Sequence, residues 1–135
     1  AAVKGYETWN KTPASDRATA LRRLGDLLEE NMDEFIALCQ REAGKLYLDG
    51  VAEVREAVDF CRYYANRAEE TFREGSPLEG RGVIVCISPW NFPLAIFLGQ
   101  VTAGAFAVDI TPQISVRQTT GPGLVHGPLH GPGGD

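Results

Sequence analysis

The sequence has few cysteines and none of the short motifs that mark a zinc site or a redox pair. Its 135 residues include three cysteines, Cys39, Cys61 and Cys86, which are widely spaced and have apolar neighbours. This odd number and this spacing favour reduced, buried thiols over a disulfide framework. Neither a CxxC nor an HExxH string occurs, so the sequence indicates no metal site.

Basic residues and long apolar runs are also scarce. Lys and Arg number 13 against 18 Asp and Glu, which gives a net charge of −5 and a pI near 5.0. Because the phosphates of nucleic acids select basic surfaces, we expect no nucleic-acid partner. No apolar run approaches the roughly 18 residues of a membrane span, and no signal-peptide pattern opens the chain. We therefore expect a cytoplasmic protein and, since the chain lacks an initiator Met and opens in helical sequence, a piece of a longer one.

Over most of the first 73 residues, apolar side chains recur at spacings of three and four, which is typical of amphipathic helices. Thr12 and Pro13 form a helix-start signal, with Thr12 as the cap and Pro13 as the first helical residue. Gly44 is a helix stop. The longest apolar seam runs from Val51 to Phe72 and must lie against other helices or a sheet, while charged residues beginning with Glu53 mostly face water. The expected helices are 1–10, 13–30, 32–44 and 50–73.

The predicted secondary structure then changes twice within RGVIVCISPWNFPLAIFLGQV, from a strand to a sharp loop and from the loop to a helix. The apolar, β-branched run at 82–87 is typical of a strand buried on both faces, as in a parallel sheet. Pro93 fits the first turn of a helix expected at 93–107. The predicted fold class is therefore α/β. Such proteins place ligands and reactive groups in loops at the carboxyl ends of strands, and this loop contains the ring of Trp90 and the amide of Asn91.

The final segment, 108–135, is rich in Gly and Pro and predicts a disordered tail. Within it, Gly121 to Gly123 imitates a dinucleotide glycine pattern, but Pro128 follows and prevents the helix that such a site requires. His126 and His130 have the spacing of two metal ligands on one helical face. The surrounding Gly and Pro exclude that helix, so we expect at most weak, incidental metal binding.

The string SPWNFP at 88–93 resembles the signature of the NAD(P)-dependent aldehyde dehydrogenases. The longer string VCISPWNFPLAIFLGQV, together with EVREAVDFCRYYA at 53–65, resembles the glutamate-semialdehyde (pyrroline-5-carboxylate) dehydrogenase part of proline utilization A. The resemblance covers roughly residues 1–107 and then fades. A string that specifies Trp, Asn and two Pro is a specific signal, well above a lone glycine pattern.

This resemblance implies a Rossmann-like parallel sheet, NAD as the cofactor and a small-molecule aldehyde as the substrate. The implied reaction is the oxidation of L-glutamate 5-semialdehyde to L-glutamate in proline catabolism. Asn91 is then the amide donor that stabilises the oxyanion of the tetrahedral intermediate. The residues implied to line the nicotinamide-ribose side of the cofactor pocket are Ile87, Ser88, Pro89 and Trp90.

Other features of that family are missing from this sequence. The family nucleophile lies in an F-x-x-x-G-Q-x-C context and the general base in E-L-G-G-K, and neither string occurs. Cys39 and Cys61 lie on apolar helix faces and Cys86 on a buried strand, where burial keeps a thiol inert. A longer connection before Arg81, and a strand ending in Lys-Pro that holds the adenosine ribose, are also absent. We therefore expect this chain, as an N-terminal fragment of such a dehydrogenase, to be inactive in isolation.

Three other interpretations stay open. In the first, the loop is an ordinary strand-to-helix turn in which Asn91 bonds local backbone and Trp90 packs in the core. In the second, the chain is a non-catalytic helical interaction module. It would cover its seam at Val51 to Phe72 and its unpaired strand at 83–87 by binding a partner or by self-association. The third, an autonomous nucleotide-binding domain, lacks the Lys-Pro strand that such a domain needs.

Overall fold

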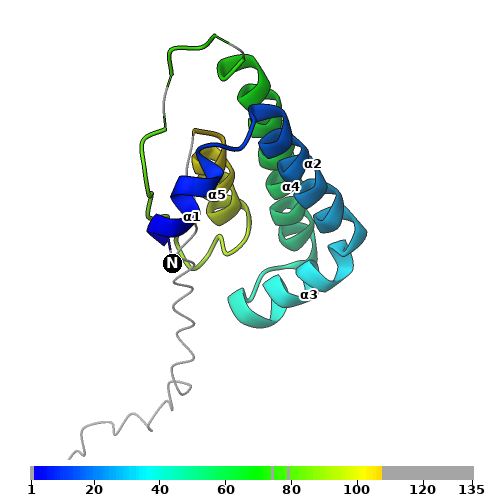
Figure 1. The fold of residues 1–135 in the computed structure, drawn as a ribbon. Helices are drawn as coiled ribbons and strands as arrows, with labels where there is room; N and C mark the ends of the chain where they lie inside the picture. Colours follow the sequence, from blue (N-terminus) through cyan, green and yellow to red (C-terminus); the bar gives the residue numbers. More distant parts are fainter. Residues whose placement is uncertain (1, 74, 79, 108–135) are drawn as a thin grey trace, which may run out of the picture.

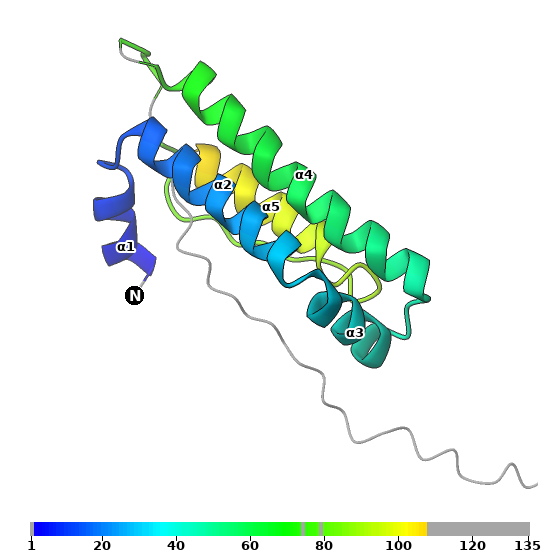
Figure 2. The ribbon, with the colours of Figure 1, turned by 90° about the vertical axis from the view of Figure 1, so that its right-hand side faces the viewer.

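The computed structural model describes residues 2–73, 75–78 and 80–107, and the tail predicted to be disordered, 108–135, lies outside them. The described part contains helices and no strand. Figures 1 and 2 show the helices gathered around α4, with α3 at one end of the group. The helices are α1 (Ala2–Trp9), α2 (Ala14–Glu30), α3 (Met32–Ala43), α4 (Tyr47–Thr71) and α5 (Ala95–Ala107).

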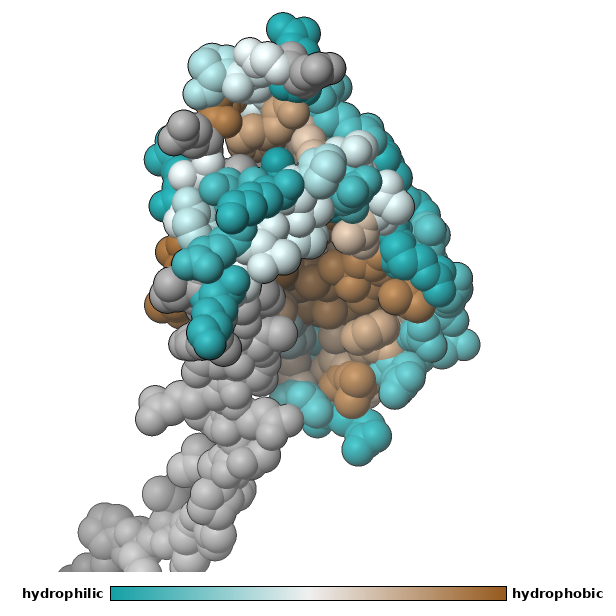
Figure 3. All heavy atoms as spheres, viewed as in Figure 1, coloured by the Kyte–Doolittle hydropathy of each residue, from teal (hydrophilic) through white to brown (hydrophobic). Residues whose placement is uncertain are grey.

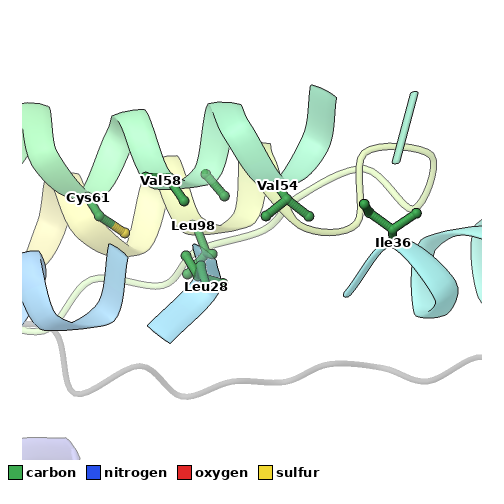
Figure 4. Packing of buried hydrophobic residues seen from close by; sticks show 7 residues of the cluster. Leu28, Ile36, Val54, Val58, Cys61 and Leu98 are labelled. Atoms are coloured by element: carbon green, nitrogen blue, oxygen red, sulfur yellow. The ribbon is translucent and has the colours of Figure 1, made fainter. Parts of the chain in front are cut away.

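The central element is α4, which packs against α2, α3 and α5. Figure 4 shows side chains from these four helices meeting in one core. The seam on α4 that the sequence predicted is therefore covered by the chain's own helices. The interaction-module interpretation assumed that this seam is exposed, and that assumption is wrong. The buried members of the core are Leu28, Ile36, Val54, Ala57, Val58, Cys61 and Leu98.

A second apolar cluster joins the start of α2 to the ends of α4 and α5. Most of its members are small, which lets the helix backbones approach one another closely. Trp9 packs against this cluster, and its indole Nε1–H donates to the carbonyl oxygen of Ala105 at 3.3 Å. This contact attaches α1 to α5. The buried members are Ala18, Leu21, Ala65, Ala68 and Ala105.

The helix that was predicted to begin at residue 50 begins earlier, at Tyr47. The Gly50 N–H donates to the Leu46 carbonyl oxygen at 2.9 Å, so the first turn closes ahead of the apolar seam. Leu46, Tyr47 and Leu48 are all exposed. Because they do not extend the buried seam, periodicity could not reveal this first turn.

The predicted capping by Thr12 is wrong. The Thr12 hydroxyl donates to the Thr8 carbonyl oxygen at 3.1 Å, behind the helix start rather than ahead of it. Pro13, with φ −52° and ψ 145°, precedes the first helical residue instead of occupying it. The stop at Gly44 is present, because this residue has φ 64°, a left-handed conformation that glycine adopts without a Cβ clash.

Residues 82–87 form no strand in the part of the chain that the structure describes, and Gly82 has a positive φ of 92°. Their side chains alternate: Ile84 and Cys86 are half-buried, whereas Val85 is 69% exposed. The prediction of burial on both faces is therefore wrong. Cys86 packs against the second cluster, so helices cover one side of this segment, and among the described residues nothing covers the other.

The helix α5 is apolar on nearly every side, which is typical of a buried helix. It comes close to α4 at Gly99, where a Cβ atom would lie 2.9 Å from Cε2 of Phe60. Only glycine allows this approach, since a real Cβ does not sit that close to a ring carbon. No helix among the described residues is long and apolar enough to cross a bilayer.

We expect Gly99→Ala to lower the free energy of unfolding by about 1–2 kcal/mol. Overpacking against the Phe60 ring costs about 1–3 kcal/mol. The higher helix propensity of Ala relative to Gly offsets about 0.5–1 kcal/mol of that cost. Urea unfolding followed by circular dichroism measures the difference. Adding Phe60→Leu removes the clashing ring edge, so the double variant should lose less than the sum of the single variants. A more stable Gly99→Ala chain would contradict this packing.

Candidate functional site

The loop at 88–93 links the extended segment to α5 and is closed by a turn. The Phe92 N–H donates to the Pro89 carbonyl oxygen at 3.3 Å, which is the closing bond of a four-residue β-turn. Trp90 and Asn91 occupy its two central positions. Trp90 is 76% exposed. The turn presents an aromatic ring and a side-chain amide where a ligand can reach them.

Asn91 is exposed, and its amide makes no hydrogen bond within the described residues. The interpretation in which Asn91 bonds local backbone and Trp90 packs in the core does not fit this geometry. Instead, the two N–H donors of the amide face solvent and are available to an acceptor.

The remaining residues implied for the site precede this turn. Ser88 is half-buried and Pro89 is exposed, while the Ile87 side chain is 81% exposed. The Ile87 carbonyl oxygen accepts a hydrogen bond from Nε2 of Gln100 at 2.9 Å, which fixes the end of the extended segment to α5. Reasoning from the sequence did not identify Gln100 as a residue that holds the loop. The feature that could have identified it is its long polar side chain in an otherwise apolar helix.

Glu53, which the sequence placed among the water-facing residues, is only 3% exposed. Its Oε2 accepts hydrogen bonds from the backbone N–H groups of Leu94 at 3.2 Å and Ala95 at 2.9 Å. These are first-turn amides of α5, which have no partner inside their own helix. Glu53 therefore caps α5 from a helix more than forty residues earlier in the chain.

Lys45 lies beside the same carboxylate. Its Nζ is 2.9 Å from Oε1 of Glu53, and its side chain is 15% exposed. The ammonium group also lies 4.2 Å from the centroid of the Phe92 ring, a cation–π geometry. The ion pair and the ring contact join the connection between α3 and α4 to the end of the turn.

None of the three thiols has the environment of a nucleophile. Cys39 and Cys61 are buried, as predicted, and Cys86 is half-buried. Burial raises the pKa of all three thiols, and raises that of Cys61 to about 11. Because the thiolate is the reactive form, these cysteines stay protonated and unreactive at neutral pH.

A separate hollow of about 320 Å³ lies on the outer side of α4. It is lined by Glu56, Asp59, Phe60 and Tyr63 and includes no residue of the loop. Within the described residues, no group of three or more His, Cys, Asp and Glu side chains is placed to hold a metal ion.

The loop thus presents an exposed Trp-Asn turn between residues 82–87 and α5. Residues 1–108 match the aldehyde dehydrogenase family, and the chain belongs to that family. The resemblance inferred from the sequence is thus confirmed, and the matched range contains the loop and both elements that hold it.

Individual relatives point within that family to enzymes of proline breakdown. The bifunctional protein PutA of Salmonella typhimurium is 47% identical over 106 residues, which cover 78% of this chain and 8% of PutA. The 1-pyrroline-5-carboxylate dehydrogenase of Bacillus mycoides is 37% identical over 110 residues, which cover 73% of this chain and 21% of that enzyme.

Solved structures agree with these relatives. A 1-pyrroline-5-carboxylate dehydrogenase from Thermus with bound NAD is 33% identical and superposes with a TM-score of 0.75. The match covers 83% of this chain and 24% of that enzyme. The chain therefore spans only a small part of the length of each of these proteins.

We expect the alkylation rate of Cys61 in the folded chain to keep rising between pH 8 and pH 10. Its pKa of about 11 leaves only a small thiolate fraction throughout that range. In urea, where Cys61 is no longer buried, the rate should stop rising at a pH just above the ordinary thiol pKa of about 8.5. Iodoacetamide labelling with peptide mass spectrometry measures both curves. A folded-state rate that levels off near pH 8.5 would show that Cys61 is not held in an apolar site.

Proposed function

We propose that this chain supplies one side of the active site of an NAD-dependent aldehyde dehydrogenase that oxidises L-glutamate 5-semialdehyde to L-glutamate in proline catabolism. The observation that carries the proposal is the exposed turn of Trp90 and Asn91 at the start of α5. The relatives support the substrate class, because they are named PutA and 1-pyrroline-5-carboxylate dehydrogenase.

In this proposal Asn91 stabilises developing charge. When a thiolate attacks an aldehyde, the carbonyl oxygen becomes an oxyanion, and an amide N–H placed beside it lowers the barrier. One preorganised donor of this kind contributes about 2.7–4 kcal/mol. The exposed amide, which has no competing partner among the described residues, suits this role.

We also propose that the residues before Asn91 form one wall of the NAD site. The exposed side chains of Ile87 and Trp90 supply apolar surface for a flat ring, while Ser88 and Pro89 shape the backbone between them. When bound, NAD serves as the oxidant of the reaction. Within the described residues the loop offers one wall, and further residues of the dehydrogenase would complete the site.

The α/β fold class belongs to the same proposal. The alternating exposure of residues 82–87 suits a strand that lacks a neighbour among the described residues. A parallel strand beside it would pair its backbone and place the loop at the carboxyl end of the sheet. The cytoplasmic location stays a prediction from the sequence.

We expect the isolated chain to show no NAD-dependent turnover of glutamate semialdehyde, because none of its thiols is activated. To test the role of the loop, residues 1–107 replace the matching segment of the Bacillus mycoides enzyme. The chimera should turn over, and Asn91→Ala within it should lower kcat by about 10²–10³-fold. NADH absorbance measures both rates.

A matched variant, Asn10→Ala, removes an exposed amide that is distant in sequence from the loop and should leave kcat unchanged. Turnover by the isolated chain that is lost on Asn91→Ala would refute the expected inactivity, and an active chimera that Asn91→Ala does not slow would refute the role of Asn91.

We further propose that the chain self-associates while 82–87 is unpaired. An apolar segment that pairs with no strand among the described residues invites pairing with another copy. Val83, Val85 and Ile87 form its exposed side. Figure 3 shows additional apolar surface between α5 and α3.

We therefore expect the molar mass from light scattering to rise with concentration, and Val85→Lys to shift the chain toward the monomer. A charge on the exposed side of an edge segment opposes pairing. Ala52→Lys places the same charge on an exposed site of α4 and should have little effect. A monodisperse monomer at every concentration would rule out self-association.

A further inference from the structure

We propose that Glu53 and Lys45 are positioning residues that hold the loop at 88–93, and with it the Asn91 donor, in the geometry the dehydrogenase reaction requires. This inference rests on the proposed function, which gives the loop its task. The contacts that support it all lie within this chain.

The two oxygens of the Glu53 carboxylate have different partners. Oε2 accepts the backbone N–H groups of Leu94 and Ala95, and Oε1 receives the Lys45 ammonium at 2.9 Å. One side chain of α4 thus binds both the first turn of α5 and the connection that follows α3. Any shift of the α5 start must stretch at least one of these bonds.

The start of α5 depends on this outside carboxylate because its own sequence supplies no cap. Phe92, Pro93 and Leu94, which precede the helix, have no side-chain oxygen, and its first turn contains no acidic residue. Free N–H groups at a helix start carry partial positive charge and favour a nearby anion. A hydrogen bond to a charged acceptor is also stronger than one to a neutral acceptor.

Lys45 extends the restraint from the helix start to the turn. Its ammonium lies over the ring of Phe92, whose N–H closes the turn around Trp90 and Asn91. At the opposite end, Gln100 holds the Ile87 carbonyl oxygen. The backbone of the loop is therefore held on both sides of the two projecting residues.

Burial separates this ion pair from the other ion pairs of the described chain. The pairs Arg22–Glu69 and Arg62–Glu29 are roughly half exposed, whereas Glu53 is 3% and the Lys45 side chain 15% exposed. A buried ion pair is expensive to desolvate and is weak support for stability as such. Its partners here, the first turn of α5 and the last residue of the turn, point instead to a role in geometry.

The test uses the 135-residue chain with Glu53→Gln, which keeps the shape of the side chain but removes the charge. Hydrogen exchange of the Leu94 and Ala95 amides should accelerate by about 10-fold or more, because hydrogen bonds to charged groups are lost. ¹⁵N relaxation should show increased motion of the Trp90 indole. The Trp9 indole, bonded to Ala105, is an internal reference that should not change.

Glu69→Gln is the matched control, since it removes the same charge from an exposed ion pair with Arg22 and should alter neither signal. A second variant guards against misfolding of Glu53→Gln. Lys45→Met should loosen the Trp90 indole while leaving Leu94 and Ala95 protected, and Lys45→Arg should restore the wild-type relaxation.

Two outcomes would overturn the inference. One is unchanged exchange at Leu94 and Ala95 together with an unchanged Trp90 signal in Glu53→Gln. The other is a uniform loss of protection across α2, α4 and α5 in both Glu53→Gln and Lys45→Met, which would show a purely structural role. Both measurements are made without aldehyde or NAD, so their failure leaves the proposed function standing. An active chimera that Asn91→Ala does not slow, with normal exchange at Leu94 and Ala95, would count against the proposed function alone.

Discussion

The geometry of the loop depends on one buried carboxylate, that of Glu53. Moving a carboxylate out of water is costly, and it is tolerated only when donors replace the lost solvent. Here two backbone amides of α5 and the Lys45 ammonium supply those donors. Because these donors come from two parts of the chain and the carboxylate from a third, satisfying the charge fixes the three parts relative to one another. The apolar core sets how closely α4 and α5 pack, and this carboxylate sets where α5 begins.

Much of the helical fold was predictable from the sequence, because the period of the apolar residues determines which face of each helix is buried. The seam on α4 is the clearest case, and its residues are buried as expected. The same reasoning failed at Glu53, since a charged side chain on a helix is normally solvated. Its spacing from Gly50 and Ala57, both buried, nevertheless places it on the buried face. The charge of Glu53 favoured exposure, but its position in the helix determined that it is buried.

The extended segment shows a different limit. Its β-branched residues predicted a buried strand, which the described residues do not form. The burial of a strand depends on which other strands and layers lie beside it, and these come from distant sequence. For the loop, the exposure of Trp90 was likewise beyond composition, because a Trp near a helix start more often packs inward. Only the resemblance of SPWNFP to a known family favoured a projecting ring, and Gln100 and Lys45 were not found by either route.

An oxyanion donor stabilises charge effectively only when it needs no reorganisation during the reaction. A side-chain amide on an exposed turn would by itself be poorly ordered, which conflicts with that requirement. For the proposed role of Asn91, the order would come from the backbone of the loop and not from contacts of its side chains. Lys45, Glu53 and Gln100 hold backbone or ring atoms on either side of the turn, while the Trp90 and Asn91 side chains make no hydrogen bond or ring contact with another described residue. This arrangement suits one half of a site: its frame is fixed from within the chain, and its contact surface stays open to the groups that complete it.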